Sequence, residues 1–322
     1  MYHYPIKGDL CMKAKTKLDS FNKFLSIVCV ITFIALICVI AFTDGKQAEA
    51  PVEEGSNDDV SVLDAEFTPG TYGGVAFNSV DDVVAYYVEA FDYTKTLTAP
   101  YTENGESKTY YKLLADENLA VENLLVEGKS NDMINKLVPG ILDGIFKGAP
   151  KGIPVAANRD PQYDYREDGP NGTQLDQKES HLTADDVLAC NVVDNGDGTI
   201  SITIQPKGVI LSQADQDAQG RFFNVLGDIS STVESISVLS FSEGTIDENF
   251  VVNYKGGTGT VKIDTATKEI VEADYTMRVH IDVQHANVAV LKDKKASLDI
   301  VYTNHAPASD EFLLSSRNIT RG

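Results

Sequence analysis

Tryptophan is absent from this 322-residue chain, and positive charge is scarce. Lysine and arginine together number 27 against 48 aspartates and glutamates, so the net charge is −21. A surface this acidic repels the phosphate backbone of nucleic acids. The composition therefore excludes nucleic acid as a partner, while its 43% of hydrophobic residues is enough for a folded core.

The motifs of the common enzyme classes are also missing. The chain has no Gly-x-Ser-x-Gly elbow, no phosphate-binding loop and no His-Glu-x-x-His pair. His280 and Asp282 would share the polar face of a strand, but zinc needs three or four converging ligands. We therefore expect no catalytic residues, no metal and no cofactor, and a surface hydrolase is the least favoured function.

Charge is missing altogether from residues 24–43, FLSIVCVITFIALICVIAFT. As a helix, this run would span roughly 30 Å, the thickness of the hydrocarbon core of a bilayer. Five lysines and two aspartates precede it, and acidic sequence follows it. Because positive residues favour the cytoplasmic side, residues 1–23 are predicted to be cytoplasmic and the remainder extracytoplasmic, in a single-pass protein of the cell membrane.

Two questions about this end of the chain stay open. Ala48-Glu49-Ala50 has the small-x-small form of a cleavage site, although Pro51 directly after it is unfavourable. The alternative to an uncleaved anchor is therefore a cleaved signal segment. Translation can begin at Met1 or at Met12, and the lysine-rich sequence after Met12 is the more usual start of such a segment.

Cysteine is rare, and its positions agree with an extracytoplasmic placement. Cys11 precedes the apolar run, Cys29 and Cys38 lie within it, and only Cys190 follows it. No disulfide can therefore form within the outer part of the chain. An extracytoplasmic protein without disulfides fits a Gram-positive bacterial surface better than an animal secretory pathway.

Beyond the apolar run, the sequence divides into three parts. Residues 44–70 are acidic and poor in apolar residues, so we expect a flexible tether. The extracytoplasmic α+β domain is predicted to span residues 71–306, and a charged and polar tail spans 307–322.

Two helices are expected early in the domain. The first, over 79–94, has an apolar face and can be capped by Asn78 or Ser79. The second, over 131–147, carries a broad apolar stripe and contains Pro139-Gly140, which should kink it. The long polar loop 148–180 that follows is expected to be a mobile excursion or a lid.

From residue 182 onward, apolar and polar residues alternate in several long runs. Ile200, Ile202 and Ile204 share one face, and residues 275–283 and 296–302 follow the same pattern. Alternation of this length indicates an antiparallel sheet with one face packed and the other in water. Residues 255–257 and 264–268 are expected to be turns between strands.

The stretch Asp-Asn-Gly-Asp-Gly-Thr at 194–199 can be read as a calcium loop or as a hairpin turn. Placing Gly196-Asp197-Gly198 in the middle of an EF-hand loop puts Val193 and Ile204 where oxygen ligands are required. The flanking residues alternate like strands, and Asn-Gly and Asp-Gly tolerate the positive φ that tight turns need. We therefore predict a hairpin turn.

This organisation resembles that of uncharacterised membrane-anchored surface proteins of Gram-positive bacteria. The stretch GTGTVKIDTATKEIVEADYTMRVHID, a turn followed by a long alternating strand, is similar to repeats in half-barrel lipoproteins of the lipoprotein-carrier and lipid-binding types. The resemblance implies a curved antiparallel sheet that wraps helices and shelters a lipid or acyl chain. The chain departs from that family because the residue before Cys29 or Cys38 is not the small residue of a lipobox, and no binding residue carries over.

The sequence thus predicts an α+β fold, in which a curved, half-barrel-like antiparallel sheet packs on a few helices and follows one transmembrane helix. The expected function is a non-catalytic, membrane-anchored binding or carrier module for an apolar or envelope ligand. The alternative is a structural or interaction protein of the envelope without a small ligand. The candidate ligand-binding residues are Leu137, Ile141 and Ile145, on the apolar stripe of the second helix.

Overall fold

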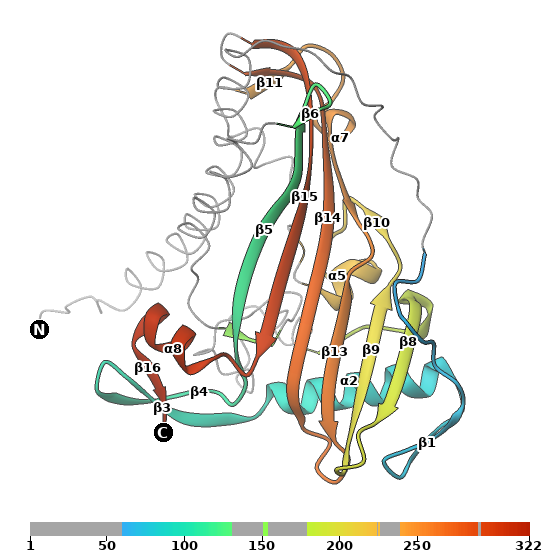
Figure 1. The fold of residues 1–322 in the computed structure, drawn as a ribbon, viewed down its shortest axis with the longest axis vertical. Coiled ribbons are helices and arrows are strands. Elements are labelled where there is room, and N and C mark those ends of the chain that lie inside the picture. Colours follow the sequence, from blue (N-terminus) through green and yellow to red (C-terminus); the bar gives the residue numbers. More distant parts are fainter. Residues whose placement is uncertain (1–59, 131–150, 154–178, 224, 226–238, 289–290) are drawn as a thin grey trace, which may run out of the picture.

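The computed structural model describes residues 60–130, 151–153, 179–223, 225, 239–288 and 291–322 (Figure 1). The predicted membrane segment, most of the tether and the candidate residues Leu137, Ile141 and Ile145 lie outside these ranges. Within the ranges, no helix is both long enough and apolar enough to cross a membrane. The expected combination of an antiparallel sheet with a few helices is confirmed, and the sheet is open.

One large antiparallel sheet forms most of the described structure. Its main path follows the strand order β6-β5-β15-β14-β13-β9-β8, while β10, β11, β12 and β7 pair at its sides. These strands are β5 (Leu114–Val126), β6 (Lys129–Ser130), β7 (Lys151–Gly152), β8 (Val187–Asp194), β9 (Thr199–Pro206), β10 (Val209–Ile210), β11 (Leu239–Phe241), β12 (Phe250–Tyr254), β13 (Thr258–Asp264), β14 (Ile270–Val288) and β15 (Leu291–Ala306).

The longest elements, β14 and β15, pair along nearly their whole length. Figure 1 shows this hairpin reaching far beyond β13, β9 and β8, with β5 beside β15. On its other side, β14 pairs in turn with β13, β12 and β11. The predicted alternation is confirmed, because Tyr275, Met277 and Val279 are buried while Asp274 and Arg278 are exposed.

Residues 255–257 are not the turn that the sequence suggested. β12 and β13 run in the same direction and both pair with β14, so this segment joins two collinear strands and carries one residue more than the facing part of β14. The extra residue makes a β-bulge. Gly256 has a φ of 71°, and a Cβ on Gly257 would lie 2.6 Å from the carbonyl oxygen of Thr276. Glycine is therefore required at both positions.

Helix α2 (Val80–Lys95) covers one face of the sheet near its lower end in Figure 1. We call this face inner and the opposite face outer. The helix begins at Ser79, whose hydroxyl accepts a hydrogen bond from the amide of Asp82, as one of the two predicted caps requires. The hairpin of β1 (Gly70–Tyr72) and β2 (Val75–Phe77) leads into it.

The interface between α2 and the sheet is a packed core. Tyr87 lies 5.6 Å from Phe91 and 5.7 Å from Phe222 between ring centroids, and Phe222 lies 5.7 Å from Tyr275. These four rings are at most 4% exposed. Phe222 comes from the short helix α5 (Ala218–Phe222). Two other short helices, η1 (Ala184–Asp186) and α7 (Ile246–Asn249), also lie beside the large sheet.

A second, smaller core holds the C-terminal segment. Strand β16 (Ile319–Arg321) pairs with β3 (Thr98–Glu103), which pairs with β4 (Glu106–Tyr111), and helix α8 (Asp310–Arg317) packs beside them. Leu313 and Ile319 are fully buried there. The residues that composition sets apart as a tail therefore belong to the folded structure.

Candidate functional site: a groove on the outer face of the sheet

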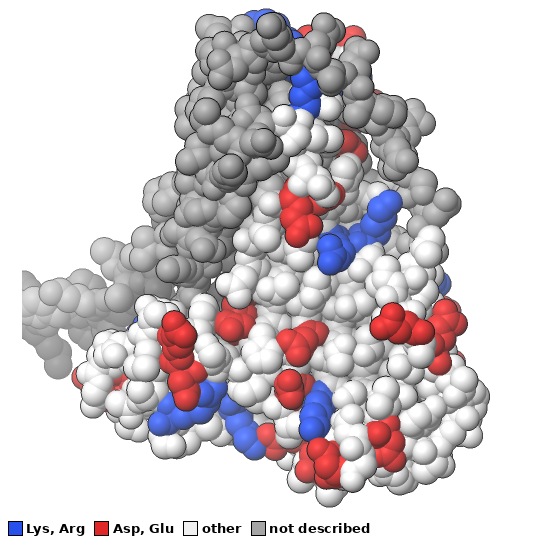
Figure 2. Space-filling view, viewed as in Figure 1, with Lys and Arg blue, Asp and Glu red and all other residues white. Residues whose placement is uncertain are grey.

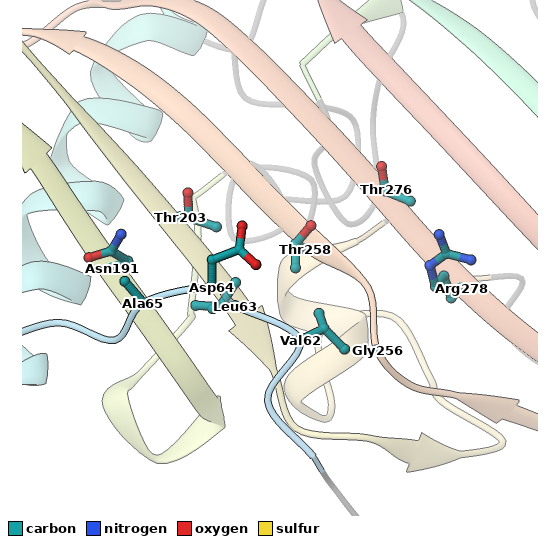
Figure 3. A pocket seen from close by; sticks show the side chains of 10 residues that line it. All are labelled: Val62, Leu63, Asp64, Ala65, Asn191, Thr203, Gly256, Thr258, Thr276 and Arg278. Atoms are coloured by element: carbon teal, nitrogen blue, oxygen red, sulfur yellow. The ribbon is translucent and has the colours of Figure 1, made fainter. Parts of the chain in front are cut away.

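Residues 60–67 cross the outer face of the sheet, and we call them the strap (Figure 3). The side-chain amide of Gln205, which is 1% exposed, accepts a hydrogen bond from the amide of Val62 and donates one to the strap carbonyl two residues earlier, at 2.8 and 2.9 Å. The backbone of Phe67 then donates to Cys190 in the edge strand β8, at 2.7 Å. The last part of the expected tether is thus docked on the sheet.

A groove of about 670 Å³ lies between the strap and four strands of the sheet. This volume is within the range of small-ligand sites. Its floor comes from β8, β9, β13 and β14, together with the glycine bulge, and the strap forms one wall (Figure 3). The lining residues are Val62, Leu63, Asp64, Ala65, Asn191, Thr203, Gly256, Thr258, Thr276 and Arg278.

The floor is polar because each of its side chains occupies an outward position of a strand. Thr203 lies between the buried Ile202 and Ile204, and Asn191 lies between Cys190 and Val192, which are also buried. The same alternation in β14 turns Thr276 and Arg278 outward. The bulge leaves room in the groove because Gly256 has no side chain. Next to it, the backbone amide of Lys255 donates a hydrogen bond to the carbonyl of Arg278, at 3.1 Å.

Several polar groups of the groove are available to a ligand. Within the part of the chain that the structure describes, Asp64, Thr258, Thr276 and Arg278 have no side-chain hydrogen bond or ion pair. By contrast, the hydroxyl of Thr203 is 2.9 Å from that of Thr260. The groove therefore offers a guanidinium, a carboxylate and two hydroxyls beside the apolar side chains of the strap.

The histidines that the structure describes each contact an aspartate, with ring nitrogen to carboxylate oxygen distances between 2.6 and 2.8 Å. Three of the pairs join β14 to β15, and we call them the His–Asp rungs. Two of the rungs, Asp274–His305 and His280–Asp299, are directly opposite each other in the strand register. The pairs are His181–Asp215, His280–Asp299, His285–Asp293 and His305–Asp274.

Two of the rungs, those of His280 and His305, favour protonated histidine. The hydrogen bond to Asp299 raises the pKa of His280 above its usual 6.5, and it outweighs burial, which acts in the opposite direction. Asp282 adds to this effect because its carboxylate lies 3.2 Å from Nε2 of the same ring. The hydrogen bond to Asp274 likewise raises the pKa of His305. An imidazolium between carboxylates holds strands together but has no nucleophile beside it.

The predicted hairpin turn at 194–199 is confirmed, because β8 and β9 pair on either side of it. Asp194 accepts hydrogen bonds from the amides of Gly73 and Gly196, and Asp197 accepts from Thr199 and from the ammonium of Lys262, at 3.0 Å. The carboxylates of Asp194 and Asp197 are therefore already hydrogen-bonded to donors within the protein. Across the described ranges, no three His, Cys, Asp or Glu side chains converge as a metal site.

Cys190 is a core residue. It is 3% exposed, and burial raises the pKa of its thiol to about 11. At neutral pH almost none of it is the thiolate that nucleophilic chemistry needs.

Sequence reasoning did not identify the groove. Its strap lies in a segment whose acidic composition predicts a tether, and Gly256-Gly257 reads equally as a turn or a bulge. One signal was available: Val60, Val62 and Leu63 are apolar residues at the end of an otherwise polar stretch. The outward position of Arg278 did follow from alternation.

Comparison with family models, curated proteins and solved structures finds no match to this chain.

Proposed function

We propose that this chain is a non-catalytic binding module, anchored in the cell membrane by residues 24–43 with its folded part outside the cell. The uncharged run and the lysines before it support the anchor. The groove supports the binding role, and it is the single observation that carries this proposal. Its unpaired polar groups face solvent next to the strap, the segment that leads back toward the anchor.

The ligand we propose is a component of the envelope, held on the outer face. A lipid carrier would need an apolar cavity on the inner face. Between α2 and the sheet that space is filled by Tyr87, Phe91 and Phe222. The apolar pocket expected around Leu137, Ile141 and Ile145 stays a prediction because those residues lie outside the described ranges. The relation to half-barrel lipoproteins stays a prediction because no comparison matches.

The packed core also favours a second candidate, an interaction protein of the envelope with no small ligand. The two functions differ in the groove. A binding module needs the groove open, whereas a structural protein does not depend on it.

Cosedimentation tests the proposal. Full-length protein in detergent should sediment with the insoluble envelope fraction of the cells that produce it. Thr258→Trp should abolish this, because the indole would fill the groove. Thr109→Trp, at an exposed position of β4, should leave sedimentation unchanged. Equal melting temperatures would show that both variants fold. If Thr258→Trp sediments like the parent protein, the groove is not the binding site.

A further inference from the structure

The groove carries charges of both signs, one on the strap and one on the strand β14 of its floor. Arg278 projects from β14, and Figure 3 shows the carboxylate of Asp64 pointing from the strap into the groove between Thr203 and Thr258. Within the described residues neither side chain makes a hydrogen bond or an ion pair, although Arg278 acts at longer range on Asp299 and helps to lower the pKa of that carboxyl. A ligand that satisfies both must carry an anionic group at one end and a cationic group at the other.

The register of the sheet gives the scale of the groove floor between Thr258 and Arg278. Thr258 pairs with Thr276, and Arg278 follows two residues later on the same strand. Diagonal neighbours of this kind are roughly 7–8 Å apart across an antiparallel pair. An extended peptide advances about 3.3–3.6 Å per residue, so two or three residues span this separation.

The remaining lining suits a peptide. The hydroxyls of Thr258 and Thr276 can donate to or accept from peptide groups, and the amide of Asn191 has both functions. Leu63 and Ala65 offer apolar contact to small side chains. The net charge of −21 disfavours a purely anionic ligand at long range, and Figure 2 shows Asp and Glu side chains spread over the face that it presents. A zwitterion carries no net charge to repel.

We propose that the groove binds a di- or tripeptide with free ends, whose carboxylate pairs with Arg278 and whose ammonium pairs with Asp64. This assignment rests on the proposed function and names its ligand, a peptide that is joined to the insoluble envelope through a side chain and so keeps both ends free. Because Asp64 belongs to the strap, a bound peptide ties the strap to β14 and so connects occupancy of the groove to the segment that leads to the membrane.

Calorimetric titration of the full-length protein in detergent tests the peptide. The probes are dialanine and trialanine, each with free ends, with an acetylated N-terminus or with an amidated C-terminus. A free-ended peptide should bind, and blocking either end should weaken binding about tenfold, since each block removes one charged partner. In Arg278→Gln, the acid and the amide should bind alike. In Asp64→Asn, the free and the acetylated N-termini should bind alike.

Two matched controls remove a charge elsewhere. Lys292→Gln and Glu106→Gln lie at exposed positions outside the groove and should keep both preferences of the parent protein. If Arg278→Gln still distinguishes acid from amide, the proposed orientation is wrong. If no peptide binds at millimolar concentration while Thr258→Trp abolishes cosedimentation, the binding module stands and the peptide assignment fails. If both experiments fail, the groove has no binding role.

Discussion

At the scale of single residues, the contact between α2 and the sheet depends on one buried hydrogen bond. The hydroxyls of Tyr87 and Tyr275 lie 2.9 Å apart, and both rings are at most 2% exposed. Burial raises the pKa of each far above its usual value, so both stay neutral. One hydroxyl donates to the other, and both lie in the buried core.

Removing both hydroxyls should therefore cost less than the sum of the costs of removing each one alone. Tyr275→Phe leaves the Tyr87 hydroxyl unsatisfied and should lower the free energy of unfolding by about 1–3 kcal/mol. The double variant with Tyr87→Phe should lose less than the sum of the two single variants, measured by urea unfolding. Tyr86→Phe is the control, because its buried hydroxyl has no partner within the described residues. Additive losses would show that the two hydroxyls do not interact.

The turn at 194–199 gives a second prediction at this scale. Hydrogen bonds from Thr199, followed by the ammonium of Lys262, lower the pKa of Asp197 to about 2. We expect an NMR titration to find this low pKa in the parent protein and a higher one in Thr199→Val. We also expect millimolar calcium to leave the melting temperature unchanged. A rise of several degrees that disappears in Asp197→Ala would instead establish a calcium site.

At the scale of elements, the β14–β15 hairpin is the feature most sensitive to pH. The pKa values of His280 and His305 are raised in the folded protein, so protonation stabilises the folded state. This stabilisation is fully present below the unfolded pKa of about 6.5 and is lost as pH rises through the higher folded pKa values. Asp299, whose pKa is lowered mainly by the hydrogen bond to His280, sets the acidic limit of the window.

Hydrogen exchange of the β14 and β15 amides measures this effect. The free energy of opening should fall between pH 6 and pH 8.5 in the parent protein, and it should change less in the His280→Gln/His305→Gln variant. The groups that face the two histidines are Asp282, Asp274 and Glu272 of β14, Asp299 of β15 and Asp116 of β5. The same pH dependence in the double variant would assign the effect to other groups.

The strands also show how much of the fold could be predicted from the sequence. The strands were predictable because period-2 alternation reports directly which side chains face the core, as for Ile200, Ile202 and Ile204. The bulge at Gly256-Gly257 was not predictable, because the local sequence does not show whether the chain reverses there or continues along the same neighbouring strand. That difference is decided by pairing with β14, which follows in the sequence.

At the scale of the whole molecule, the groove could not be predicted for a related reason. Its walls come from the strap, β8, β9, β13 and β14, which are far apart in the sequence, and their meeting depends on the order of strands in the sheet. The strap is held by the side chain of Gln205, a residue whose outward position predicts only a polar surface. In the sequence, the strap lies between the predicted anchor and the strands of the groove.

We propose that the groove lies outside the cell and is occupied there by an envelope ligand. Labelling of Thr258→Cys with a membrane-impermeant maleimide tests both parts, because the buried Cys190 should react little. In wall-stripped cells, this cysteine should react as fast as one at the exposed Thr109→Cys position. In intact cells, it should react more slowly than that control, since the ligand covers it. Labelling that requires permeabilised membranes, or that proceeds equally at both positions in intact cells, would contradict the account.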